Sequence, residues 1–318
     1  MRGRTDEGEL RGSSTNGMLV DMSLHSKNPD VAFELAQRVA GRYSGIAQVE
    51  AVAMGGSRSS DAADAASDVD LYVYYREPLP LEIRRQIAAP NRRAEIGNDF
   101  WEPGDEWIDA EAGLSVDVMF RHVTWIEERL NGVLEHHWAS VGYSTCFWYN
   151  VRHSQILMDR QGWFAALQKK AGQPFPPELK RAIIAKNFPI LRRNMSSYVH
   201  QIELAILRQD LFSVHHRTTA LLASYFDILF AVNEQPHPGE KRLTQFASRL
   251  CGKLPAGFPQ AVDEMLLVKG GDSQIIEKAN ALLDGLDALL LREGLLPKQG
   301  TAGAAQPMQS PWRHPLAK

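Results

Sequence analysis

The stretch Met54–Tyr75, MGGSRSSDAADAASDVDLYVYY, contains the residues that decide the fold. It ends in a run of β-branched and aromatic residues that begins at Asp68 and is typical of a strand. Side chains two residues apart on a strand share a face, so we expect Asp68 and Asp70 side by side, with Val69 on the other face. Two adjacent carboxylates repel each other, and a divalent cation between them would remove that repulsion.

A glycine-rich turn precedes the two aspartates. The apolar run Val49–Met54 predicts a strand that leads into the turn, and the small-residue stretch 57–66 predicts a short helix after it. Backbone N–H groups at such a turn point outward and bind phosphate oxygens, and the helix dipole adds to this attraction. The stretch therefore predicts a phosphate site and a metal site joined by one short helix.

This pattern resembles the signature of the DNA polymerase β-type nucleotidyltransferase superfamily, in which Gly-Ser, a spacer of similar length and Asp-x-Asp occur in that order. The superfamily needs a third carboxylate on a neighbouring strand, and the segment Leu114–Phe120 supplies Asp117 between two valines. The resemblance covers about residues 46–121 directly. Among its members, the chain is similar to antibiotic-modifying enzymes of the aminoglycoside and lincosamide kind, which carry a helical domain after the catalytic one.

Each motif also has an ordinary structural interpretation. A Gly-Gly-Ser sequence is often only a turn, and an Asp-x-Asp sequence is often a solvated strand end or a helix cap. Asp117 would then be a buried strand residue paired with a nearby arginine such as Arg121. The order of the three motifs favours the nucleotidyltransferase interpretation.

The resemblance implies transfer of a nucleoside monophosphate, with AMP from ATP as the first expectation, to a hydroxyl of a small-molecule acceptor. Two Mg²⁺ ions would assist the reaction, and aspartates are ligands suited to Mg²⁺. Asp68 and Asp70 are expected to bind the nucleotide-side metal, and Asp117 the acceptor-side metal. These three residues are the predicted catalytic and metal-binding set.

The resemblance also implies a set of residues that bind the triphosphate of ATP or another nucleoside triphosphate. Arg58 either joins this set or pairs with Asp61 or Asp64. The segment 233–243 resembles a turn of the helical domain that places a lysine near the triphosphate, although it is equally consistent with a solvated turn. The expected nucleotide-binding residues are Gly55, Gly56, Ser57, Arg58 and Lys241.

The acceptor is less determined by the sequence. Segment 101–111 combines carboxylates with aromatic rings, which suits a cationic, sugar-like molecule. A protein acceptor is an alternative, as is a nucleotide-binding sensor or antitoxin-like protein without catalysis, against which the three aspartates argue. The acidic residues among which a separate general base would be found are Glu95, Glu102, Asp105 and Glu106.

Composition limits the class of protein. The chain has 318 residues, 44% hydrophobic and 23% charged, as is ordinary for a globular protein of two domains. Its net charge of −3 argues against a long nucleic-acid substrate. Cys146 and Cys251 lie far apart without metal-binding spacing, which favours a reducing cytoplasm. We expect neither a signal peptide nor a membrane-spanning segment.

The predicted fold class is α+β: a mixed sheet with helices, followed by an all-helical bundle. The expected divisions are a disordered extension at 1–28, a catalytic domain at 29–172, a helical domain at 173–296 and a disordered tail at 297–318. In the catalytic domain we expect helices at 29–43, 81–89, 124–135 and 161–171, strands at 92–97 and 155–159, and a hairpin or active-site loop at 98–113. In the helical domain we expect helical stretches at 178–209, 211–233, 241–251 and 273–293.

Overall fold

The computed structural model describes residues 29–55 and 68–296 of the chain. Within these residues the sheet has six strands in the order β3-β4-β5-β2-β1-β6. The strands are β1 (Val49–Met54), β2 (Val69–Tyr75), β3 (Arg92–Asn98), β4 (Gly104–Ile108), β5 (Ser115–His122) and β6 (Gln155–Asp159). Strands β2 and β5 run parallel, and the other neighbouring pairs run antiparallel. The predicted mixed sheet of an α+β protein is confirmed.

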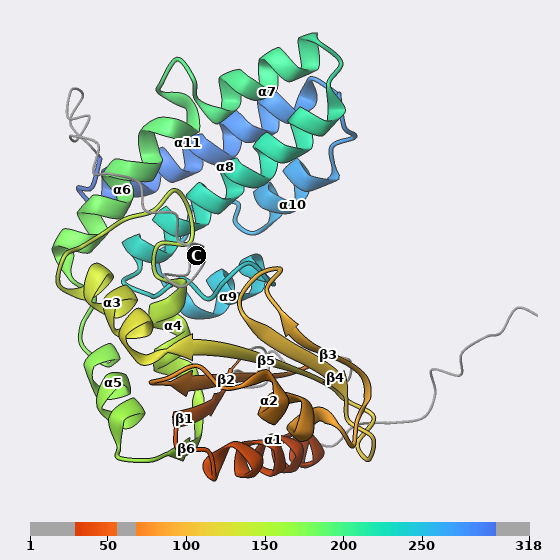
Figure 1. Cartoon of the computed structure of the whole chain (residues 1–318). Helices are drawn as coiled ribbons and strands as arrows, with labels where there is room; N and C mark the ends of the chain where they lie inside the picture. The colour runs from red at the N-terminus through yellow and green to blue at the C-terminus, as the bar shows by residue number, and fades with distance from the viewer. Residues whose placement is uncertain (1–28, 56–67, 297–318) are drawn as a thin grey trace, which may run out of the picture.

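Helices cover the two faces of the sheet unequally. One face carries Val69, Leu71 and Val73 of β2 and forms a core with the helices α1 and α2. The opposite face carries Tyr72 and Tyr74 and forms a second core with α3, α4 and α5. Figure 1 shows α1 below the sheet and the C-terminal helices above it. The helices are α1 (Pro29–Ser44), α2 (Leu81–Ala88), α3 (Val123–Leu134), α4 (Cys146–His153) and α5 (Trp163–Ala171).

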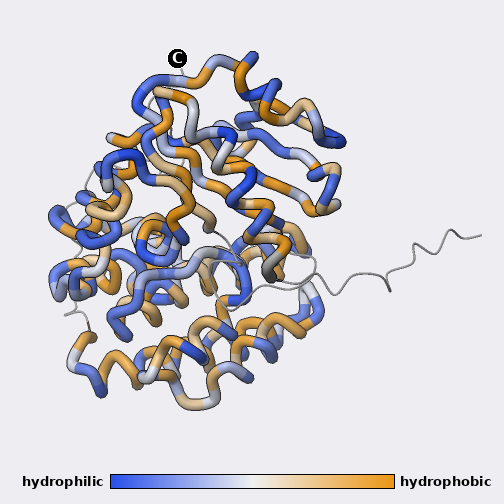
Figure 2. The backbone as a smooth tube through the Cα atoms, turned by 90° about the horizontal axis from the view of Figure 1, so that it is seen from below, coloured by the Kyte–Doolittle hydropathy of each residue, from blue (hydrophilic) through white to orange (hydrophobic). Residues whose placement is uncertain are grey.

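The second half of the described chain is helical. Its hydrophobic core is built from buried side chains of α6 to α11, with α8 contributing an almost continuous buried run. Figure 2 shows hydrophobic and hydrophilic residues interspersed along the backbone of the described chain. The helices are α6 (Pro177–Arg192), α7 (Tyr198–Leu207), α8 (Leu211–Val232), α9 (Leu243–Leu250), α10 (Gln260–Leu267) and α11 (Gln274–Arg292). Across the residues described, no helix combines the length and hydrophobicity needed to cross a bilayer.

The junction between the two halves is shared. Leu179 and Ile183 of α6 pack into the core that α3, α4 and α5 form on the sheet, whereas Ile184 and Phe188 of the same helix pack into the helical core. One helix therefore belongs to both cores. The predicted boundary between residues 172 and 173 stays a prediction, and the predicted termini at 1–28 and 297–318 lie outside the described residues.

Two features of the helical architecture differ from the sequence-based expectation, and one expected helix is not tested. The expected stretch 178–209 is two helices, because Ser197 begins α7 as an N-cap whose hydroxyl oxygen accepts a hydrogen bond from the His200 N–H. The helices α4 and α10 were not predicted from the sequence, since each has only 8 residues and a short apolar repeat. The stretch 57–66, expected as a helix, lies outside the described residues.

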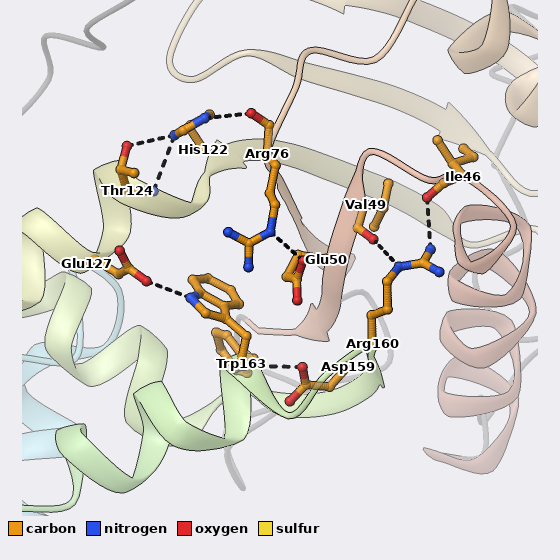
Figure 3. Close-up of polar contacts among 11 residues, drawn as sticks. Ile46, Val49, Glu50, Arg76, His122, Thr124, Glu127, Asp159, Arg160 and Trp163 are labelled. Carbon is orange, nitrogen blue, oxygen red and sulfur yellow. Dashed lines mark hydrogen bonds and ion pairs between the residues drawn. The ribbon is translucent and has the colours of Figure 1, made fainter.

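Polar side chains fasten the end of the sheet at which β1 begins and β2 ends (Figure 3). Glu50 is buried and accepts a hydrogen bond of 2.7 Å from Arg76, the residue after β2. Arg160, the residue after β6, donates to the backbone oxygens of Val49, Ser44 and Ile46, each at 3.0 Å. These contacts fix the strands at one end, and the carboxylates of Asp68 and Asp70 lie at the other.

Candidate functional site

A row of carboxylates crosses four strands on one face of the sheet. Asp70 on β2 is paired with Asp117 on the parallel strand β5. Asp117 is paired with Glu106 on β4, and Glu106 in turn with Glu95 on β3. Paired residues of neighbouring strands point to the same face, so all four acids start from one side of the sheet. We call these four residues the carboxylate row.

The row lies on the face that carries Tyr72, and Asp68, the residue before β2, is one of the carboxylates whose charge acts on Asp117. The valines next to Asp117, Val116 and Val118, are fully buried in the core of the opposite face. The strand alternation predicted for both segments is therefore confirmed. The structure brings two of the three predicted aspartates into direct register.

Several other carboxylates lie near Asp117 and disfavour its ionised form. Burial, together with the nearby carboxylates of Asp70 and Glu106, raises the pKa of Asp117 to about 7. Asp68 and Glu102 act in the same direction over a longer range. A cation bound next to Asp117 would offset the repulsion among these carboxylates and stabilise the ionised form of Asp117.

The donor set of the row fits Mg²⁺, which prefers hard oxygen ligands such as carboxylates. Among the described residues, no three His, Cys, Asp or Glu side chains lie close enough together to hold one ion. The strand pairing fixes the backbone positions from which the carboxylate side chains of the row start. The predicted metal ligands Asp70 and Asp117 thus share a face, and the role of Asp68, Asp70 and Asp117 as ligands stays a prediction.

The glycine turn begins directly beside the row. Gly55 follows β1, is buried, and donates its N–H to the backbone oxygen of Asp70 at 3.0 Å. A Cβ atom at Gly55 would lie 2.2 Å from Cε2 of Tyr72, so no larger residue fits without displacing that ring. The other predicted residues of the phosphate turn, Gly56, Ser57 and Arg58, lie outside the described residues.

The structure separates the four candidates for a general base. Asp105 is on the opposite face, fully buried, and bound to Arg84 at 2.9 and 2.5 Å, so its candidacy is wrong. The physical reason is strand alternation: Asp105 shares its face with the core residue Trp107, and Glu106 lies between them on the other face. Glu106 and Glu95 are exposed members of the carboxylate row.

The fourth candidate, Glu102, is bound to Arg121. The carboxylate accepts two hydrogen bonds from that guanidinium, at 2.8 and 2.9 Å. This pairing also bears on Asp117, whose ordinary structural interpretation offered Arg121 as an example of a nearby arginine partner. The described contacts give Arg121 to Glu102 instead.

Lys241 lies in the turn before α9 and has an exposed side chain. The turn is anchored by His237, whose backbone N–H donates to the Thr145 hydroxyl at 2.8 Å and whose ring lies 5.0 Å from that of Tyr143. Helix α9 continues over α4, where Phe246 contacts Tyr149. The assignment of Lys241 to the triphosphate stays a prediction.

Two residues of the site were not identified from the sequence. Tyr72 supports the start of the glycine turn, and Arg121 packs on Tyr72 with its guanidinium carbon 3.9 Å from the ring centroid. The alternation of β2 places Tyr72 two residues beyond Asp70 on the same face, which is the signal that could have found it. Its contact with Gly55 depends on how β1 and β2 pair, which the sequence does not reveal.

Comparison with known proteins gives distant structural likeness. No protein-family profile matches the chain, and no curated protein matches it in sequence. A nucleotidyltransferase-like protein from Exiguobacterium sibiricum aligns with 83% of this chain and 76% of its own at 14% identity and a TM-score of 0.39. The STING-associated CdnE c-di-GMP synthase from Capnocytophaga granulosa aligns with 84% of this chain and 81% of its own at 10% identity and a TM-score of 0.25. Likeness at this level does not identify a function for this chain.

Proposed function

We propose that the protein is a Mg²⁺-dependent nucleotidyltransferase that moves a nucleoside monophosphate from a nucleoside triphosphate to a hydroxyl group of a small molecule. The observation that carries this proposal is the register of Asp70 with Asp117 on parallel strands, beside the turn that begins at Gly55. A carboxylate pair next to a glycine turn suits a phosphate ester that arrives with a divalent cation.

Each part of the chain has a proposed role. Asp68 and Asp70 hold the metal on the nucleotide side, and Asp117 holds the metal on the acceptor side. When bound, the two ions neutralise the triphosphate and favour the deprotonated acceptor hydroxyl. The backbone N–H groups of Gly56 and Ser57 and the Ser57 hydroxyl would receive the phosphate oxygens, with Arg58 and Lys241 as further cations, while Gly55 begins the turn and its N–H is bound to Asp70. ATP is the expected donor.

The proposed binding site for the acceptor lies over β4 and β3. The nucleotide occupies the side of β1 and β2, so the remaining part of the carboxylate row, Glu106 and Glu95, faces the other substrate. Neighbouring strands lie about 4.8 Å apart, which places these carboxylates within one or two strand spacings of Asp117. Positive groups on the acceptor would pair with them, and the exposed rings of Phe100 and Trp101 lie in the turn between the same two strands.

Pyrophosphate release provides the test. The full chain is incubated with each nucleoside triphosphate and a panel of hydroxyl acceptors, with Mg²⁺ or with EDTA, and products are identified by their mass. We expect Mg²⁺-dependent pyrophosphate release that Asp70→Ala abolishes, while Asp263→Asn, a change at an exposed aspartate on α10, leaves it intact. Full turnover in Asp70→Ala would contradict the proposal, as would a wild-type chain that binds no Mg²⁺–triphosphate.

A further inference from the structure

Arg121 connects the two sides of the candidate site beneath its surface. It lies on β5, four residues after Asp117 and on the same face, and only 2% of it is exposed. A buried guanidinium has to be matched by partners, because burial of an unpaired charge is costly. We infer that Arg121 is a positioning residue that sets both the glycine turn and the β3–β4 hairpin, an inference that rests on the proposed nucleotidyl transfer.

The first set of contacts leads to the acceptor side. Arg121 Nε and Nη2 donate to the two carboxylate oxygens of Glu102 at 2.8 and 2.9 Å. Glu102 belongs to the turn between β3 and β4, and Pro103 in the same turn accepts a backbone hydrogen bond from Phe120 at 2.8 Å. The hairpin that carries Glu106 is thereby fixed to the strand that carries Asp117.

The second set of contacts leads to the nucleotide side. The guanidinium carbon lies 3.9 Å from the centroid of the Tyr72 ring, a distance typical of cation–π packing. The edge of that ring fills the space in which a Cβ of Gly55 would stand. A shift of the Tyr72 ring would therefore move Gly55, the first residue of the glycine turn. Arg121 Nη1 adds a bond of 3.3 Å to Asn150 of α4, and the rings of Phe147 and Trp125 have their centroids 5.4 and 5.8 Å from the guanidinium carbon.

Lysine cannot replace this arginine in both functions. A guanidinium is planar, binds a carboxylate with two parallel N–H groups and stacks on a ring, whereas an ammonium is a compact point charge. Arg121→Lys keeps the positive charge and much of the volume, but it loses the paired contact to Glu102 and the flat packing on Tyr72. The substitution therefore changes the positions of Glu102 and Tyr72 while the charge at residue 121 stays the same.

Arg84 provides a matched control on the opposite face of the same sheet. It is also largely buried, binds both carboxylate oxygens of Asp105, and packs 4.1 Å from the centroid of the Phe120 ring. Arg84→Lys should lower the free energy of unfolding about as much as Arg121→Lys, because the partners and the burial are alike. Arg84 also donates to the Gly104 backbone oxygen at 2.9 Å, so it holds the β3–β4 hairpin from the opposite face but has no contact with Tyr72 at the glycine turn.

The experiment measures steady-state transfer and Mg²⁺–ATP affinity for the full-length wild type, Arg121→Lys and Arg84→Lys well below their melting temperatures. We expect kcat/KM to fall about 100-fold in Arg121→Lys, the effect of a displacement of about 1 Å at a reacting centre. Both kcat and the KM for ATP should change, since the hairpin and the turn both move. Arg84→Lys should keep the wild-type KM for ATP, because Arg84 contacts the hairpin and not the glycine turn. Equal kinetics in the two variants would overturn the positioning role.

A second variant tests the inference even if Arg121→Lys does not fold. In Arg121→Met combined with Glu102→Gln, both charges are removed together, a change that often leaves stability nearly unaltered. We expect a cooperative melt close to that of the wild type with transfer still reduced at least tenfold, and near-normal transfer would contradict the inference. A wild-type chain that neither binds Mg²⁺–ATP nor releases pyrophosphate would overturn the proposed function, and with it this inference. Wild-type turnover with unaffected Arg121 variants would overturn the inference alone.

Discussion

At the scale of single residues, the site depends on a glycine that has no room for a side chain. Gly55 is held between the backbone of Asp70 and the ring of Tyr72. Its requirement is steric, because a Cβ there would lie 2.2, 2.7 and 2.8 Å from three atoms of that ring. The first turn residue is thus fixed by packing as well as by its hydrogen bond.

Gly55→Ala should lower stability by about 1–3 kcal/mol, the usual cost of overpacking, and weaken Mg²⁺–ATP binding because the turn is displaced. Tyr72→Leu in the same chain removes the obstructing ring, so the double variant should lose less than the sum of the two single losses. Urea unfolding and calorimetric titration with Mg²⁺–ATP measure the two effects. Gly41→Ala is the control, since a Cβ at that helix position meets no atom within 4 Å. Strict additivity of the two changes would show that the contact is unimportant.

Asp117 has a separate expected role from the other two aspartates. Asp117→Asn should leave Mg²⁺–ATP binding largely intact, because Asp68, Asp70 and the turn remain, and should reduce transfer by orders of magnitude. Stability should not fall, since the change removes a charge that burial and neighbouring carboxylates disfavour. Calorimetric binding and a transfer assay on one sample distinguish the outcomes. Retained transfer would remove Asp117 from the mechanism.

At the scale of elements, strand alternation explains why part of the site was predictable. The pattern of β2 and of β5 predicted correctly that Asp70 and Asp117 lie opposite their buried valines, because alternation is a local property. The position of Glu106 next to Asp117 could not be predicted in this way. It depends on the pairing of β4 with β5 and on irregularities in the β3–β4 ladder, both of which are set by contacts between distant residues.

The same distinction holds for the helices. The long stretch at 211–233 was predicted almost to its ends, because its 22-residue helix carries a sustained apolar pattern. The short helices α4 and α10 were not predicted, since a short segment becomes helical through packing against its neighbours. Tertiary contact, which the local sequence does not encode, decided those elements.

The far end of the sheet provides a prediction about stability alone. Arg160 donates to three backbone oxygens that join β1, β6 and the turn after α1, so Arg160→Ala should lower the free energy of unfolding by about 1–2 kcal/mol. Transfer per folded molecule should not change, because these contacts lie at the end of β1 opposite Gly55. Arg181→Ala, which breaks an exposed pair with Glu178, should cost less than about 0.5 kcal/mol. Urea unfolding measures both, and equal losses would argue against the role of Arg160.

At the scale of the whole molecule, one buried carboxylate joins the helical half to the loop before α4. Asp227 of α8 is 1% exposed and accepts hydrogen bonds from the Ser144 N–H at 3.0 Å and the Ser144 hydroxyl at 2.6 Å. Asn187 of α6 donates to the same carboxylate at 3.2 Å and accepts from the Gly142 N–H at 2.9 Å. Burial nevertheless raises the pKa of Asp227 to about 7, against these hydrogen bonds that lower it.

This pKa makes the connection between the two halves depend on pH. The folded chain holds a proton on Asp227 at pH values where the unfolded chain, with an ordinary carboxyl pKa of 3.8, has released it. Stability from this group is therefore present below about pH 4 and is lost as the pH rises to about 7. At about 1.4 kcal/mol per pKa unit, the loss amounts to about 4 kcal/mol. The Asp227→Asn variant has no carboxyl group at this position, so its stability does not show this decrease with rising pH.

The measurement is urea unfolding of the wild type and of Asp227→Asn at a series of pH values from 4 to 8. The free energy of unfolding of the wild type minus that of the variant should decrease across this range and level off above pH 7. Any effect of the substitution that does not depend on pH shifts this difference curve up or down without changing its shape. Asp117 also titrates near pH 7 in the folded chain, but it does so in both proteins and cancels in the difference. A flat curve for Asp227→Asn would mean that the three hydrogen bonds that Asp227 accepts keep this carboxylate ionised within the folded chain, and that the two halves are joined by a charge at every pH tested.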